Sequence, residues 1–223
     1  AGRAGRVAEG VCYRLWTQAS EHLMQEQRIP EIISADLSSM LLSLYDFGEK
    51  NFEDIPWLTF PLKSNAEKAK ELLLELEAID SCGNMTMLGK RIANMPCHPR
   101  IAKMMVCEED KTTRSLACDI AALLEERDPM ALNDDADITL RIATLRRLRK
   151  CNNLGRWQRI AQIAAEYRRM AKTDESNQDP VPQDVGSLIA RAYPERIAMS
   201  TDNIGTFRMA NGSNVRVTTN NDI

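Results

Sequence analysis

The chain has 223 residues, of which 43% are hydrophobic, and this is enough for one or two globular units with buried cores. Charged residues make up 27% and aromatic residues 5%, a balance that favours a mainly helical protein over a sheet-rich one. The net charge of −3 does not by itself indicate a nucleic-acid-binding protein.

The sequence argues against a histidine-dependent enzyme, a membrane-spanning protein, and a domain held by zinc or disulfides. The two histidines are isolated from any nucleophile pattern, and no apolar run approaches the length of a membrane span. The cysteines form no CxxC pair and have no histidine at zinc-site spacing, so we expect reduced thiols of a cytoplasmic protein rather than a disulfide framework. These cysteines are Cys12, Cys82, Cys97, Cys107, Cys118 and Cys151.

The chain opens with a Gly-Arg segment, 1–6, and then alternates apolar and polar side chains over residues 10–16, as a β-strand does. A helix is predicted over residues 18–27 and ends before a proline. We therefore predict that residues 1–28 form the end of a larger α/β unit.

Residues 29–96 have the outline of a winged-helix domain, with a helix over 37–47, a loop, a second helix and a short strand over 85–87. Ser64 and Glu67 match a capping box, in which each side chain bonds a free backbone amide of the first helical turn. The second helix carries apolar residues at helical spacing, which should form one buried face. They are Ala66, Ala69, Leu72, Leu73, Leu76 and Ile79.

Residues 97–172 are predicted to form a helical bundle. Pro99 suits the first turn of a helix that runs through Met105 or Cys107. Thr112 or Thr113 can cap the next helix, and residues 127–129, Arg-Asp-Pro, close it.

Two more helices, predicted over 138–150 and 154–170, carry most of a basic block. Between Arg141 and Lys172 there are ten lysines or arginines and a single acid, Glu166. The local charge of +9 in a chain of net charge −3 is more informative than the total.

We expect the apolar residues of the first of these helices, such as Ile142 and Leu145, to face the bundle. Arg141, Arg149 and Arg156 would then point outward. Such a surface can follow a nucleic-acid backbone through phosphate contacts without reading sequence. The alternative is a solvated face whose charge is offset by acids elsewhere. The candidate contacts are Arg141, Arg146, Arg147, Arg149, Lys150, Arg156 and Arg159.

Towards the end, a polar segment with two prolines, 173–184, is predicted as a linker and residues 185–193 as a short helix. Residues 207–217 are predicted to form a β-hairpin. A three-residue loop with Gly212 in the left-handed conformation keeps its apolar side chains on one face, whereas a two-residue Asn-Gly turn would split them. These side chains are Phe207, Met209, Val215 and Val217.

Three segments carry a family resemblance. Residues 2–15 contain GRAGR and GVCYRL, residues 85–104 contain MTMLG and PRIAKM, and residues 121–129 are AALLEERDP. In this order they resemble DEAH/RHA-type ATP-dependent RNA helicases, at the end of motif VI, at the junction of the winged-helix and ratchet domains, and in the ratchet domain. Residues 190–198 and 209–212 resemble the bacterial HrpB-type branch, which implies a bacterial cytoplasmic protein.

The resemblance implies a mainly α fold divided into five parts. They are a remnant of the second RecA-like domain (1–28), a winged-helix domain (29–96), a helical ratchet domain (97–172), a linker (173–184) and the start of an HrpB-type C-terminal region with a small β-hairpin (185–223).

The resemblance also implies roles for Arg3 and Arg6. As arginine fingers of motif VI they would reach the ATP phosphates in the parent protein, where a planar guanidinium offers two directed donors to the transferred phosphoryl group. The alternative is a flexible basic tail. ATP and Mg²⁺ are the cofactors expected of the parent. This chain has neither a GxxxxGK[ST] phosphate loop nor a DEAH box, so we expect it not to bind or hydrolyse ATP alone.

We therefore expect the parent to be an RNA helicase in which these units hold single-stranded RNA, with DNA as a further substrate to test. The alternative is a non-enzymatic RNA-binding or protein-docking module. A winged-helix DNA-binding regulator is disfavoured, because the lysines of the helix that follows residue 62 are offset by acids. These residues are Lys63, Lys68 and Lys70 against Glu67, Glu71, Glu75 and Glu77.

Overall fold

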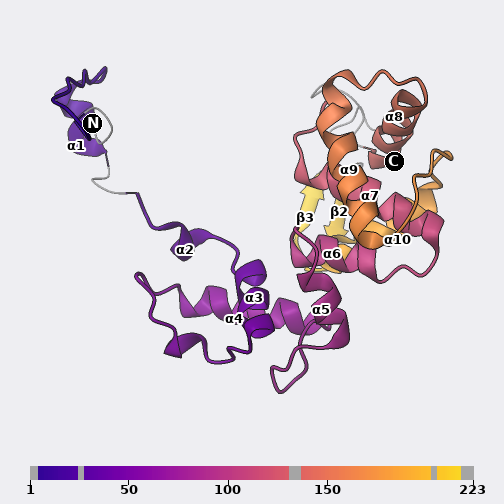
Figure 1. Ribbon diagram of the computed structural model, residues 1–223, viewed down its shortest axis with the longest axis horizontal. Helices are drawn as coiled ribbons and strands as arrows, with labels where there is room; N and C mark the ends of the chain where they lie inside the picture. Colours follow the sequence, from indigo (N-terminus) through magenta and orange to yellow (C-terminus); the bar gives the residue numbers. More distant parts are fainter. Residues whose placement is uncertain (1–4, 25–27, 131–136, 202–204, 217–223) are drawn as a thin grey trace.

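The computed structural model describes residues 5–24, 28–130, 137–201 and 205–216, and it is mainly helical with one small sheet near the C-terminus (Figure 1). This confirms the predicted class. None of the described helices is long and apolar enough to cross a membrane. The helices are α1 (Gln18–Leu23), α2 (Glu31–Ser34), α3 (Ser38–Phe47), α4 (Lys63–Glu75), α5 (Met87–Ala93), α6 (Pro99–Val106), α7 (Lys111–Glu125), α8 (Ile138–Lys150), α9 (Gln158–Ala171) and α10 (Pro182–Ala192), with 3₁₀ turns η1 (Phe52–Asp54), η2 (Gly155–Trp157) and η3 (Pro194–Arg196).

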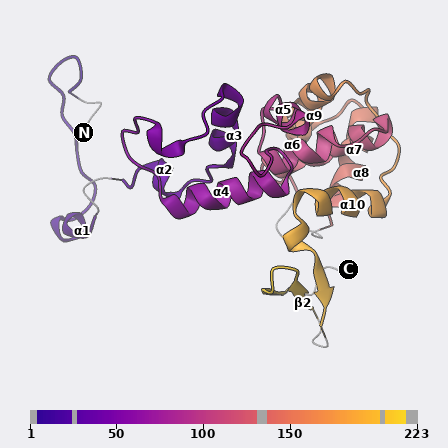
Figure 2. The ribbon, with the colours of Figure 1, turned by 90° about the horizontal axis from the view of Figure 1, so that it is seen from below.

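The N-terminal segment lies apart from the helices that follow (Figures 1 and 2). Its helix α1 begins at the predicted residue, where the Thr17 hydroxyl caps the amide of Ser20. The strand predicted over residues 10–16 is wrong: Val11 is 77% exposed and Tyr13 84% exposed, and no strand is assigned there. Alternation alone does not hold a strand, which needs hydrogen bonds to a neighbour.

Helix α3 packs against both α4 and α5. On the predicted apolar face, Ala69, Leu72 and Leu73 are buried and Ala66 is half-buried. The helix ends at Glu75, so the buried Leu76 and Ile79 follow it and do not lie on it as predicted. The capping box is wrong, because α4 begins at Lys63 and its N-terminus has no side-chain cap. The side chain of Asn65 instead donates to the carbonyl of Ile33.

The predicted strand over 85–87 is wrong as well. Only one isolated bridge forms, between Ile79 and Met85. Thr86 caps α5, and its hydroxyl also donates to the carbonyl of Glu77. The segment therefore enters a helix where a wing strand was expected.

Helix α7 is the centre of the bundle. It packs chiefly against α9 and also contacts α6, α8 and α10, and all its side chains from Ser115 to Leu123 are buried. Its N-cap is Asp110, whose carboxylate accepts from the amide of Thr113, so the predicted threonine cap is wrong. Helix α8 has the predicted bounds, and η2 and α9 together cover the helix predicted over 154–170.

The segment predicted as a linker, 173–184, is hydrogen-bonded to the bundle and contains the start of α10. The Thr173 hydroxyl donates to the carbonyl of Lys111, and the amide of Ser176 donates to the Ser115 hydroxyl. At the last residue of α10, the carbonyl of Ala192 accepts from the Arg100 guanidinium.

The C-terminal sheet has three antiparallel strands in the order β1 (Ala198–Ser200), β2 (Thr206–Met209) and β3 (Asn214–Arg216). Phe207 pairs with Val215, and Gly212 has a φ of 85°, so the predicted three-residue loop is confirmed. The sequence did not predict β1, and Val217 lies outside the described residues. Figure 2 shows the sheet projecting from the bundle.

Candidate nucleic-acid interface

The basic block folds onto α8, η2 and α9, next to the buried face of α7. Ile142 and Leu145 face the bundle and are fully buried, as predicted. Arg146 and Arg149 lie on the same stripe, because they follow Ile142 by four and seven residues. Two of the predicted contacts with nucleic acid are therefore directed inward, and the prediction that Arg149 points outward is wrong.

These side chains converge on Asp119, a fully buried residue in the middle of α7. Arg149 binds it with both terminal nitrogens, at 2.8 Å and 3.0 Å. The Nε of Arg146 donates to Oδ2 at 3.0 Å, and Nη1 of Arg168 donates to Oδ1 at 2.8 Å. We call Asp119, Arg146, Arg149 and Arg168 the arginine cluster.

The cluster also holds residues 175–178 against the bundle. The carbonyl of Gln178 accepts from Arg146 at 2.6 Å, and the side-chain oxygen of Asn177 accepts from Nε of Arg149 at 3.1 Å. The Glu175 carboxylate lies 3.1 Å from Nη2 of Arg168. Each arginine therefore joins α7 to the chain that precedes α10.

Charge is not balanced inside the cluster, because three guanidiniums surround one carboxylate. Burial lowers the pKa of Arg168, while Asp119 and Glu175 favour its charged form. Arginine stays protonated in proteins even when it is buried. Three guanidiniums and one carboxylate therefore give the cluster a net charge of +2 before Glu175 is counted.

The other predicted contacts lie nearer the surface. Arg147, Lys150 and Arg156 are exposed, and Arg159 is exposed with its guanidinium 3.2 Å from the carboxylate of Glu126. We call Arg147, Lys150, Arg156 and Arg159 the basic rim. The remaining candidate, Arg141, is paired with Asp128 at 2.7 Å.

The predicted ATP contacts are Arg3 and Arg6, and the structure describes only the second. Arg3 lies outside the described residues, and Arg6 is on the exposed N-terminal segment. Among the described residues, no group of histidine, cysteine and acidic side chains could hold a metal ion.

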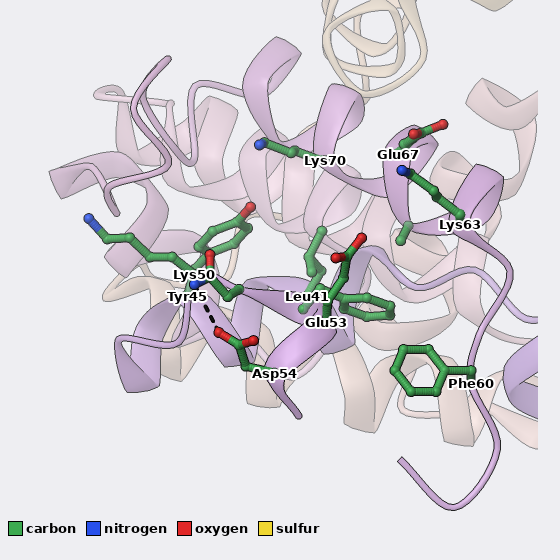
Figure 3. Close-up of a pocket in the computed structure, with 12 residues that line it drawn as sticks. Leu41, Tyr45, Lys50, Glu53, Asp54, Phe60, Lys63, Glu67 and Lys70 are labelled. Atoms are coloured by element: carbon green, nitrogen blue, oxygen red, sulfur yellow. Dashed lines mark hydrogen bonds between the residues drawn. The ribbon is translucent and has the colours of Figure 1, made fainter. Parts of the chain in front are cut away.

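A separate cavity, which the sequence did not predict, lies between α3, η1 and α4. Aromatic side chains line it, including Tyr45 and Phe60, and Figure 3 shows charged side chains of both signs around them. Its charged lining residues are Lys50, Lys63, Lys70, Glu53, Asp54 and Glu67. Because the charges balance, this cavity has no net attraction for a polyanion.

The sequence of this chain is similar to those of several known proteins. The chain is 29% identical over 212 residues to the ATP-dependent RNA helicase HrpB of Escherichia coli K12, which covers 95% of this chain and 24% of HrpB. It is 37% identical to a putative ATP-dependent RNA helicase of Schizosaccharomyces pombe and 36% identical to the ATP-dependent RNA helicase DEAH13 of Arabidopsis thaliana. Each of these matches spans 107 residues, 48% of this chain and 9% of the relative.

The fold matches as well. Two crystal structures of E. coli HrpB superpose with TM-scores of 0.72 and 0.77 at 25% identity, and cover 99% of this chain. The chain spans about a quarter of those structures, 25% and 26%. No family model matches the chain.

Proposed function

Because this chain is homologous to the DEAH/RHA helicase HrpB, as its sequence motifs predicted, we propose that it is the RNA-holding part of an ATP-dependent RNA helicase. The observation that carries the proposal is a match that extends over 95% of the chain. The names of its relatives describe ATP-dependent RNA helicases.

In this proposal the parent protein hydrolyses ATP with Mg²⁺, and Arg3 and Arg6 act there as arginine fingers. The chain itself contains no phosphate loop or DEAH box, so its own contribution is to hold RNA. In the same proposal, residues 29–96 form the winged-helix domain and residues 97–172 the ratchet domain.

The basic rim is the proposed contact surface. Its side chains are exposed and come from the end of α8, from η2 and from the start of α9. Exposed arginine and lysine bind the phosphates of any sequence, and each contact adds to the salt dependence of binding. This suits a protein that moves along a strand without reading its bases.

The test is titration of this chain with a fluorescent single-stranded oligouridylate at several salt concentrations. We compare the wild type with the triple variant Arg147→Gln, Lys150→Gln, Arg156→Gln. Single-stranded binding loses about 0.7 in its salt slope for each phosphate contact, so the triple variant should have weaker binding and a slope lower by about 2.

The matched control removes three exposed charges from α4, with Lys63→Gln, Lys68→Gln and Lys70→Gln. It should keep the wild-type slope, because acids of α4 offset these lysines. Equal losses in both triple variants would place the RNA elsewhere, and absence of wild-type binding at low salt would overturn the proposal. Competition with single-stranded DNA of equal length measures the preference for RNA.

A further inference from the structure

A shallow groove runs along α9 beside the arginine cluster. From α9 it is lined by two alanines, Ala161 and Ala165, and by the glutamines Gln158 and Gln162. Its remaining lining residues are Leu154, Arg149, Arg168 and Glu175. The groove therefore combines small side chains, which leave room for a ligand, with two guanidiniums.

The charges at this groove differ in how firmly they are held. The side chains of Arg149 and Arg168 are each 6% exposed, and Asp119 is 0% exposed. The Glu175 side chain is 45% exposed, and its residue lies outside any helix. Of the two carboxylates, Asp119 and Glu175, only Glu175 is thus reached by solvent, and its second oxygen accepts from Nδ2 of Asn177 at 2.8 Å.

The arginine cluster also has donors in excess. Nη2 of Arg146 is buried and has no hydrogen-bond partner among the described residues. With Asp119 alone the three arginines keep two uncompensated charges, and Glu175 supplies one of the two missing anions. Its carboxylate lies 3.1 Å from Nη2 of Arg168 and 3.9 Å from Nη1 of Arg149.

We propose that this groove binds one backbone phosphate of single-stranded RNA, which replaces the Glu175 carboxylate on Arg149 and Arg168. The inference rests on the proposed function. It adds that the Glu175 carboxylate competes with RNA for the two arginines. A guanidinium offers paired N–H groups that suit phosphate oxygens. Arg156 lies in the chain between the groove residues Leu154 and Gln158, so the groove adjoins the basic rim.

The first experiment removes the competitor and leaves the buried arginines unchanged, since their loss would destabilise the fold. Glu175→Gln keeps the size of the side chain and an oxygen acceptor but removes its charge. We expect oligouridylate to bind about fivefold more tightly, because the phosphate no longer has to displace a carboxylate. The salt slope should be steeper by up to about 0.7, since the displaced Glu175 of the wild type takes up a cation that offsets the one released by the phosphate.

The control is Asp179→Asn, which removes the same charge at an exposed residue that does not line the groove. It should leave the salt slope unchanged. If the wild type and Glu175→Gln bind RNA with the same affinity and slope, the groove proposal is overturned while the proposed function stands.

A second arm uses inorganic phosphate at constant ionic strength and follows the Nε–H resonances of Arg149 and Arg168 by NMR. They should shift in Glu175→Gln at lower phosphate concentrations than in the wild type. Absence of a shift in both proteins would contradict the site. If phosphate shifts these signals but neither protein binds RNA, the groove takes free phosphate only, and both the RNA assignment and the proposed function fail.

Discussion

Gly89 lies in the first turn of α5, directly against the end of the preceding segment. A Cβ atom at this residue would lie 1.9 Å from the carbonyl oxygen of Ala78 and 2.6 Å from the sulfur of Met85. The same carbonyl accepts from the amide of Thr86, so it cannot move without loss of that bond. The position therefore requires glycine for reasons of space.

Gly89→Ala should lower the free energy of unfolding by roughly 3 kcal/mol, because overpacking against a fixed backbone strains the cap of α5. The comparison is Gly186→Ala in α10, where an added Cβ meets nothing within 4 Å. That variant should raise stability by about 0.5–1 kcal/mol through helix propensity. Urea unfolding of both variants measures the difference, and a loss below about 0.5 kcal/mol at Gly89 would contradict the close approach.

The arginines illustrate what the sequence could and could not predict at this scale. Apolar periodicity correctly predicts that Ile142 and Leu145 are buried, whereas the charge of Arg149 wrongly predicts its exposure. The spacing of Arg146 and Arg149 already put them on the buried stripe, and Asp119 within an apolar helix was the signal of a partner. Their convergence could not be predicted, because it depends on how three helices pack.

At the scale of the helix, α7 depends on an N-terminal cap that can be tested with pH. The Asp110 carboxylate accepts from the amide and the hydroxyl of Thr113, at 2.7 Å and 2.9 Å. The backbone bond first, and then the side-chain bond, lower the pKa of Asp110 from its ordinary value of 3.8.

A lowered pKa in the folded state means that the charged cap stabilises the protein above about pH 4. That contribution is lost as the pH falls through the lower, folded-state pKa. Asp110→Asn keeps a capping oxygen but no charge. It should therefore melt below the wild type at pH 7, and the two melting temperatures should converge as the pH falls below the folded-state pKa of Asp110.

The control for this experiment is Glu109→Gln, which removes a neighbouring charge that does not cap α7. Circular dichroism melts of the three proteins across this pH range supply the comparison. A difference between Asp110→Asn and the wild type that persists below the folded-state pKa would show that the charge of Asp110 is not its cause.

Helices with strong apolar periodicity were predictable, and α8 has the expected bounds. Their first residues were less so, because several polar side chains near Lys63 and Lys111 can cap a helix and packing selects among them. The turn at Gly212 was predictable since loop length alone decides which hairpin residues share a face. Strand β1 was not predicted because it is only three residues long and becomes a strand by pairing with β2.

Over the whole molecule, buried side chains are concentrated in the helices from α3 to α10. The strand residues are exposed or half-buried, and α1 has no buried residue. Small sheets without a covering layer are marginal in stability. Stability should therefore be uneven along this chain.

Hydrogen exchange measured by mass spectrometry should reveal this order. Amides of α7 should exchange slowest, at the rate of global unfolding, and those of β2 and β3 should exchange faster by local opening. Gly186→Ala serves as a control, because it stabilises α10 and should leave the sheet unchanged. Protection of β2 equal to that of α7 would contradict an independently opening sheet.

Composition was enough to predict a mainly helical molecule, and short motifs were enough to predict the relationship to HrpB. The proposed RNA-contact surface was less predictable, because a count of charges does not tell buried, paired arginines from exposed ones. Of the basic block, α8 turns Arg146 inward and Arg147 outward, although the two are adjacent in the chain.

The shared carboxylate of Asp119 has a consequence for how this sequence can change over time. Loss of one arginine removes an attraction to Asp119 but also ends its repulsion with the two guanidiniums that remain, so the first loss is partly offset. A second loss ends repulsion with only one guanidinium and therefore costs more than the first. The effects are then strongly non-additive. Positions 119, 146, 149 and 168 should consequently drift as a group, each substitution depending on the history of the others.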